Sequence, residues 1–305
     1  MMAPRNKTSG IHPNDPRSGA FLFHREVPLA GFVVRDDLRP AMPAQSADGQ
    51  DCGAWLVERQ AAGVQRPSRR VYPLAEPGLF RAFAELGASD RAVLAFADTW
   101  GFLGRAQVLV ERAPGPHLGR PGESLRFWAV ARQELARLVA LWDALAGTHN
   151  EGVADEAALG TYVAWAREPV RQVTVNYPDS SFTTVAREHS PAINPDALAS
   201  WADGELVAPA RFAVVEGVNQ KLRGQASPAV NPFDERELAI VPHTLLAAMY
   251  VVFAREISGR MPAFKKCAAC DRYFFPSRSD KKYCTHSCQQ KAYEARKKTR
   301  GEDSP

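Results

Sequence analysis

Four of the five cysteines in this 305-residue chain lie within a stretch of 22 residues near its C-terminus. They form two pairs, Cys267 with Cys270 and Cys284 with Cys288, separated by thirteen residues. Two sulfurs held on a tight turn can bind one metal ion, and a second pair can complete its tetrahedron from the first turn of a helix. The spacing therefore predicts one zinc ion. Because four protein ligands leave no open position for water or substrate, we expect this zinc to be structural.

Two further residues bear on this prediction. His286 lies inside the second pair and could replace a cysteine as ligand, but four sulfurs already fill the coordination sphere, so we expect it to point outward. The fifth cysteine, Cys52, stands far from the others, and no sequence neighbour would activate its thiol. We therefore expect Cys52 to be a plain free cysteine.

The segment around the two pairs predicts the order knuckle, hairpin and helix. Residues 272–275 and 281–283 are expected to form the two strands, which turn through the residues that begin at Pro276. A helix is expected to start at the second pair and to carry basic residues beyond Cys288. This is the order of a treble-clef zinc finger.

The sequence CAACDRYFFPSRSDKKYCTHSCQQKAYEARKKTR resembles a treble-clef finger of bacterial proteins of unassigned function, whose pattern is CxxCGxxFxPxRxDxxYCSxxCRxxAYRxRK. It is similar, more loosely, to the CGNR-type fingers that follow a helical domain in bacterial transcription regulators. The likeness is close over 267–298 and extends faintly back to about residue 209. The chain departs from the pattern at Asp271 and Gln289, where Gly and Arg are usual, and it lacks the CGNR tetrapeptide. The resemblance implies nucleic-acid binding or regulation.

The positive charge of the chain is concentrated in this finger. Residues 265–300 contain eleven Lys and Arg against three acids, a net charge of +8, which leaves −4 for the rest of a chain whose formal net charge is +4. A cationic helix suits phosphate contacts, and glutamine side chains can read base edges. The predicted nucleic-acid contacts are Arg278, Lys281, Lys282, Gln289, Gln290, Lys291, Arg296, Lys297, Lys298 and Arg300. The alternative is a solvated helix end, where Lys and Arg favour the helix dipole.

Three functions therefore remain open at this point. The first is a regulator whose finger binds nucleic acid, DNA rather than RNA, and whose body senses a ligand or a partner. The alternative is a protein-interaction module in which the zinc is purely structural. The third is an enzyme with a site in the body. The sequence contains no phosphate-binding loop, dinucleotide fingerprint, HExxH helix or GxSxG elbow, so we expect no enzyme.

The rest of the chain predicts an α+β fold, with a mainly helical body and a few short strands. Strands are expected within 21–35 and loops over 36–54 and 113–122, while 177–206 carries no clear pattern. Helices are expected from about 79, from 90 to 100, and over 124–146, 155–167, 209–222 and 245–257, with a hairpin between the last two. The predicted domains are a disordered leader (1–19), the body (20–208), a helix-hairpin-helix segment (209–263), the finger (264–300) and a tail (301–305).

The cellular location is predicted from the same composition. Hydrophobic residues make up 45% of the chain and charged residues 24%, as in soluble globular proteins. The first ten residues contain no apolar stretch typical of a secretory signal, and the longest apolar run, 245–254, is too short to cross a bilayer. We therefore expect a cytoplasmic protein without a membrane partner.

Overall fold

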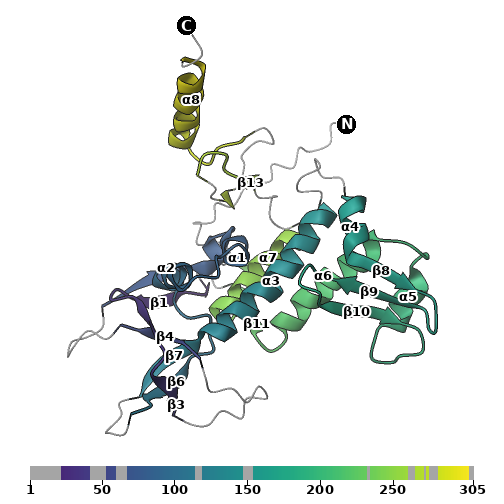
Figure 1. Cartoon of the computed structure of the whole chain (residues 1–305), viewed down its shortest axis with the longest axis horizontal. Helices are drawn as coiled ribbons and strands as arrows, with labels where there is room; N and C mark the ends of the chain where they lie inside the picture. The colour runs from purple at the N-terminus through teal and green to yellow at the C-terminus, as the bar shows by residue number, and fades with distance from the viewer. Residues whose placement is uncertain are drawn as a thin grey trace. The chain divides into compact units, whose positions relative to one another are not determined.

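The computed structural model describes most of the chain as an α+β fold, which confirms the predicted fold class (Figure 1). The described residues are 22–41, 53–59, 67–113, 119–146, 154–231, 234–259, 265–270, 273–274 and 281–301. The predicted leader and all but the first residue of the predicted tail lie outside them. Two compact units are present: unit 1 is Met1–Phe80, Gly87–Arg126 and Gly224–Pro305, and unit 2 is Arg81–Leu86 and Phe127–Arg223. The domain limits expected from the sequence stay predictions.

Unit 1 is built on a five-stranded antiparallel sheet with the strand order β2-β4-β7-β6-β3. A separate antiparallel pair joins β1 (Arg25–Pro28) to β5 (Ser68–Val71). The sheet buries an apolar cluster on one face, formed by Leu38, Trp55, Val57 and Leu109. Its strands are β2 (Phe32–Arg35), β3 (Leu38–Pro40), β4 (Trp55–Glu58), β6 (Gln107–Glu111) and β7 (Arg120–Ser124).

Two of these strands lie where the sequence predicted loops, so the loops at 36–54 and 113–122 are partly wrong. Strand β3 falls in the first, and Leu38 is fully buried there. Strand β7 begins inside the second and includes Gly122. A Cβ atom on Gly122 would lie 2.4 Å from Leu109 Cδ1, so the glycine is needed for close packing inside the sheet.

The helices of unit 1 lie where the sequence predicts them. Helix α2 (Asp90–Trp100) starts at Ser89, whose hydroxyl accepts the Ala92 N–H at 3.3 Å, and ends at Gly101. Helix α7 (Leu245–Ile257) follows the hairpin of β11 (Ala226–Asn231) and β12 (Asp234–Pro242). Nearly every side chain of α7 from its start to Phe253 is buried, so it is a core helix. A short 3-10 turn, η3 (Pro73–Ala75), packs beside it.

A buried carboxylate closes the loop between α2 and β6. Glu123 is fully buried, and its two carboxylate oxygens accept the backbone N–H groups of Leu103, Gly104 and Arg105 at 2.6–2.8 Å. The loop in turn contacts α7, because the Leu246 N–H donates to the Leu103 carbonyl at 3.0 Å. Glu123 therefore accepts from three successive backbone donors of this loop, of which the first belongs to the buried Leu103.

Unit 2 combines helices with a three-stranded antiparallel sheet in the order β10-β9-β8. The long helix α3 buries Trp128, which packs against Phe83 with ring centroids 5.9 Å apart. Arg81 on α1 pairs with Asp143 on α3 at 2.7 Å. The elements are α1 (Leu79–Ala84), which begins in unit 1, α3 (Leu125–Ala146), α4 (Glu156–Tyr162), β8 (Val163–Ala166), β9 (Gln172–Asn176), β10 (Phe182–Arg187), α5 (Pro195–Ser200) and α6 (Val207–Leu222).

The helix predicted over 155–167 is wrong in its second half. It starts as expected, with the Asp155 carboxylate accepting the Ala158 N–H at 3.0 Å, but it ends at Tyr162. The chain then forms β8, in which Val163 pairs with Val175 of β9. β-Branched residues favour a strand once a partner strand is present, and this tertiary contact outweighs the local helical pattern.

Candidate metal centre

The first cysteine pair lies on a turn between two very short strands. Strands β13 (Lys265–Lys266) and β14 (Tyr273–Phe274) pair antiparallel, with Lys265 opposite Phe274. The strand expected over 272–275 is thus present at 273–274, but the expected partner at 281–283 forms no strand. The turn of Cys267–Cys270 explains this difference. It brings β13, which precedes the turn, beside β14, which follows it, so β14 pairs with β13 instead.

The second cysteine pair lies at the start of helix α8 (His286–Gly301), as the spacing predicted. The Thr285 hydroxyl accepts the Cys288 N–H at 3.2 Å, and its carbonyl accepts the Gln289 N–H at 3.1 Å. Thr285 therefore caps the helix and fixes Cys288 in its first turn. This role was not predicted from the sequence, although a threonine directly before a helical segment is an ordinary capping signal.

The two halves of the site are joined by backbone hydrogen bonds. The Cys284 N–H donates to the Cys267 sulfur at 3.4 Å, and the Ala268 N–H donates to the Lys282 carbonyl at 3.1 Å. N–H donors directed at a sulfur are typical of the surroundings of bound thiolates, since they stabilise negative charge. Cys267 is fully buried, so this thiol has no contact with solvent.

The four sulfur atoms have the arrangement that zinc requires. The Cys284 sulfur lies 3.5 Å from the sulfurs of both Cys270 and Cys288, and all four lie within 4.8 Å of one another. Zinc–sulfur bonds of about 2.3 Å in a tetrahedron place the sulfurs about 3.8 Å apart, whereas a disulfide needs about 2.05 Å. All four are free cysteines. They form a site suited to one structural zinc ion, which confirms the predicted cofactor.

The raised pKa of one of these thiols also favours a bound cation. Burial, together with the neighbouring sulfurs of Cys270 and Cys288, raises the pKa of Cys284 to about 12. Burial opposes ionisation of Cys267, but backbone N–H groups, first that of Cys284, lower its pKa to about 6. The Thr285 hydroxyl lowers the pKa of Cys288. Cys284 therefore resists ionisation, and a zinc dication would supply the charge that stabilises four thiolates together.

His286 does not belong to this cluster. It is the first residue of α8, its side chain is exposed, and the metal-binding group within the described part of the chain consists of the four cysteines. Four sulfur ligands complete a tetrahedral zinc site, so no imidazole ligand is required.

The predicted nucleic-acid contacts are only partly placed by the structure. Lys282, Lys291 and Arg296 are exposed and Lys281 is half-buried, while Arg278 lies outside the described residues. The exposed Gln290 donates its amide N–H to Glu294 at 3.2 Å. The backbone of α8 includes the remaining predicted contacts, Gln289, which is exposed, and Lys297, Lys298 and Arg300, whose side chains are not described.

Helical periodicity divides these positions between two sides of α8. Gln289, Tyr293 and Arg296 follow an i, i+4, i+7 spacing, so they share one side, and the Tyr293 side chain is 62% exposed there. Lys291 lies on the opposite side. The predicted contact positions therefore lie around α8 rather than along one face of it.

No helix among the described residues is long and apolar enough to cross a membrane, and a cytoplasmic location stays a prediction. The resemblance of the finger to bacterial treble-clef and CGNR-type fingers stays a prediction, which rests above all on the four clustered cysteines. In the comparisons with known proteins, no family model matches this chain, and no curated protein matches its sequence.

Proposed function

We propose that this protein binds nucleic acid, duplex DNA in preference to RNA, through a C-terminal treble-clef finger, and that it acts as a regulator. The observation that carries the proposal is the attachment of an exposed, cationic helix to a four-cysteine site at its first turn. A metal-fixed helix start gives the cationic side chains a defined orientation, which a fraying chain end lacks.

Charge complementarity supplies the main driving force in this proposal. Residues 265–300 carry a formal charge of +8, and four thiolates on a zinc dication reduce it to about +6. If about five cations meet phosphates, the logarithm of the association constant falls with the logarithm of salt at a slope of about −4 to −5. The side of α8 that carries Gln289 and Arg296 is the better candidate for base contacts, because glutamine can bond to adenine edges.

The decisive experiment is a fluorescence anisotropy titration of zinc-loaded full-length protein with random duplex DNA and single-stranded RNA, at two salt concentrations. We expect micromolar or tighter binding to DNA. Replacement of Lys291, Arg296, Lys297 and Lys298 by alanine is expected to weaken it about 100-fold or more, because four phosphate contacts are lost. The salt slope is expected to fall by about 3 to 4 in the same variant.

A matched control variant distinguishes the effect of lost nucleic-acid contacts from the effect of lost net charge. Arg39, Arg91, Arg187 and Arg211 are exposed and distant in sequence from the finger, and their replacement by alanine removes the same four charges. This control is expected to retain binding within about threefold. Equal losses in both variants, or no binding at low salt by protein that holds one zinc per chain, would contradict the proposal.

A second candidate, a protein-interaction role, is favoured by the β11–β12 hairpin. Val230 lies opposite Leu238, and Pro228 lies opposite Ile240, so the four side chains share one face. The side chains of Val230, Leu238 and Ile240 are 62%, 64% and 44% exposed. Exposed apolar residues gathered on one sheet face suit an apolar protein surface. A partner bound there should resist high salt and should be lost in Leu238→Ser, whereas nucleic acid should dissociate in high salt.

A further inference from the structure

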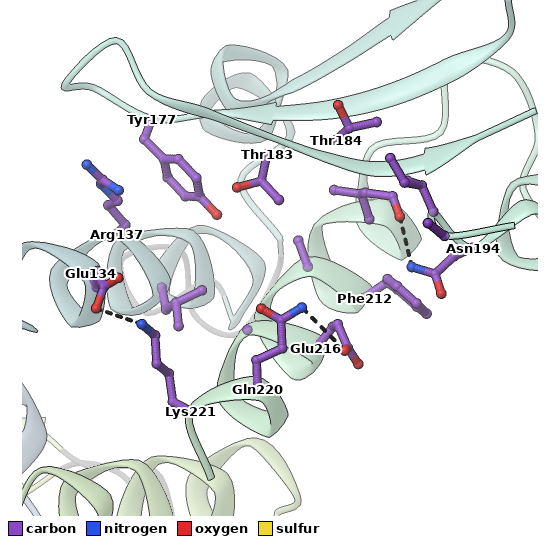
Figure 2. A pocket seen from close by; sticks show the side chains of 16 residues that line it. Glu134, Arg137, Tyr177, Thr183, Thr184, Asn194, Phe212, Glu216, Gln220 and Lys221 are labelled. Atoms are coloured by element: carbon purple, nitrogen blue, oxygen red, sulfur yellow. Dashed lines mark hydrogen bonds and ion pairs between the residues drawn. The ribbon is translucent and has the colours of Figure 1, made fainter. Parts of the chain in front are cut away.

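Unit 2 contains a cavity of about 290 Å³ between its sheet and two of its helices (Figure 2). Strand β10 and the turn that precedes it form one wall, and helices α3 and α6 form the other. Figure 2 shows Tyr177 and Thr183 on the strand side and Glu216 and Gln220 on the helix side, with the open space between them. A volume of this size suits a small organic molecule.

The sheet wall departs from regular geometry at the cavity. The β9–β10 register shifts between Thr184 and Ala186, so Val185 is an extra, bulged residue, and it lines the cavity. Asn194, which has a left-handed backbone with φ of 38°, donates its side-chain amide to the Val185 carbonyl at 3.1 Å. A bulge and a left-handed non-glycine residue each cost stability, and such features gather at binding sites.

The helix wall presents one stripe of α6 to the cavity. Phe212, Glu216 and Gln220 follow one another at four-residue spacing, which places an aromatic ring, a carboxylate and an amide in a row. Gly217 allows α6 to approach α3, because a Cβ atom there would lie 2.8 Å from Leu138 Cδ2. The cavity therefore has an apolar end and a polar floor.

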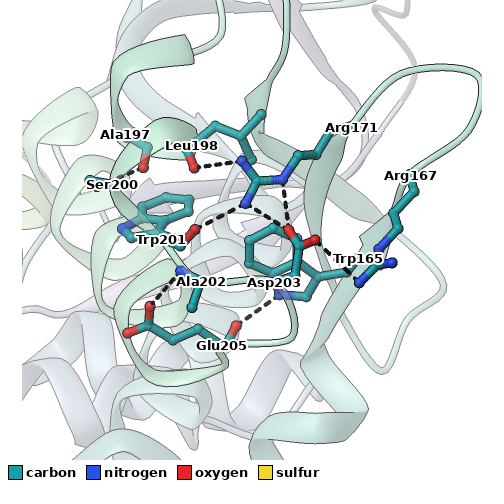
Figure 3. Close-up of polar contacts among 10 residues, drawn as sticks. All are labelled: Trp165, Arg167, Arg171, Ala197, Leu198, Ser200, Trp201, Ala202, Asp203 and Glu205. Atoms are coloured by element: carbon teal, nitrogen blue, oxygen red, sulfur yellow. Dashed lines mark hydrogen bonds and ion pairs between the residues drawn. The ribbon is translucent and has the colours of Figure 1, made fainter.

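The apolar end is held rigidly. The Phe212 ring packs edge-to-face on Trp201, with centroids 5.5 Å apart. Arg171 donates to the Trp201 carbonyl at 2.9 Å, to the Leu198 carbonyl at 3.2 Å and to the Asp203 carboxylate at 2.7 Å (Figure 3). This network joins the residue before β9 to α5 and to the segment after it, and so positions Trp201, against which Phe212 packs, before any ligand binds.

The charges around the cavity leave one carboxylate only weakly neutralised. Arg137 is bound by the Asp179 carboxylate, and Lys221 pairs with Glu134 at 2.7 Å. Glu216, by contrast, contacts Gln220 at 3.5 Å and Arg223 at 3.8 Å, and the Arg223 side chain is 77% exposed. An ion pair with such a long distance and such an exposed partner neutralises the Glu216 carboxylate only weakly. Glu216 is therefore the lining carboxylate with the weakest cationic partner, and it lies on the same stripe of α6 as the Phe212 ring.

We propose that this cavity binds a small organic amine, with its ammonium group on Glu216 and its apolar body against Phe212. A carboxylate next to an aromatic face is the arrangement that recognises ammonium ions. A carboxylate ligand would find both cations already paired with protein acids. Such a site would be the sensing part of the proposed regulator, a role that rests on the proposed function, whereas the binding itself does not.

The test uses three probes with the same ring and a two-carbon chain: 2-phenylethylamine, 3-phenylpropionate and 2-phenylethanol. Their binding to the full chain is measured by calorimetry at low salt. Nucleic acid is left out, so the result does not depend on whether the protein binds nucleic acid. We expect the amine to bind at least about tenfold more tightly than the other two, since only it forms a charge-assisted hydrogen bond.

Three variants locate the binding. Glu216→Gln keeps the contact with Gln220 and is expected to remove the preference for the amine, while Glu188→Gln, an exposed acid outside the cavity, should keep it. Ala192 is exposed at the cavity, so Ala192→Trp should narrow it without disturbing the core and should weaken binding of all three probes. No amine binding, equal binding of the carboxylate probe, an unchanged Glu216→Gln variant or an unchanged Ala192→Trp variant would each overturn the proposal.

Discussion

A Cys284→Ser variant is expected to lose nearly all of its zinc and the fold of the finger with it. The Cys284 sulfur lies 3.5 Å from the sulfurs of both Cys270 and Cys288. Structural zinc contributes about 10–16 kcal/mol to small zinc domains, and a segment with two-residue strands has little else to stabilise it. Metal analysis should fall from one zinc per chain to about a tenth or less, and amide exchange should lose protection over α8.

His286→Ala is the matched control for this experiment. It changes a residue inside the same pair, but one that lies outside the sulfur cluster. The variant should keep one zinc per chain and the protection of α8. Loss of zinc in His286→Ala, or full retention in Cys284→Ser, would assign a histidine to the coordination sphere and would refute the four-sulfur site.

The second large effect is expected in unit 1, where Glu123→Ala should lower the free energy of unfolding by about 3–5 kcal/mol. The variant leaves the N–H groups of Leu103, which is buried, and of Gly104 and Arg105 without their carboxylate acceptor. Arg25 also loses a stabilising charge: burial lowers the pKa of its guanidinium, and Glu123 acts against that shift. Urea unfolding followed by tryptophan fluorescence gives the change.

Amide exchange distinguishes a local from a general effect in this variant. Exchange at Leu103, Gly104 and Arg105 should accelerate more than exchange in the strands, because these three donors lose their acceptor directly. Glu111→Ala, an exposed acid on β6 of the same sheet, serves as the control and should change stability by less than about 0.5 kcal/mol. Equal stability losses in the two variants would show that Glu123 has no special role.

Local signals in the sequence predicted local structure well. The cysteine spacing identified the metal site because a turn of two intervening residues and the first turn of a helix fix sulfur positions without help from distant residues. The helix from 90 to 100 was found at both ends, because Ser89 and Gly101 cap it through contacts within the same segment.

Structure that depends on distant residues could not be predicted in this way. Strand β8 forms because β9 pairs with it, and Gly122 enters a strand because Leu109 and Val57 leave no room for a side chain. The acceptor role of Glu123 joins residues 18 to 20 positions apart. The cavity of unit 2 draws its walls from residues 134–221, including a stretch that shows no clear sequence pattern.

The interleaved order of the two units has a consequence for synthesis on the ribosome. All of unit 2 has been translated once Arg223 is added, whereas unit 1 still lacks α7. The core of unit 1 needs that helix, since Phe253 stacks on Phe80 with ring centroids 4.8 Å apart. Domains fold as units as the chain emerges. In the nascent chain, unit 2 can therefore fold before the core of unit 1 is complete. In a chain that ends before residue 245, we expect unit 2 to fold and unit 1 to stay incomplete.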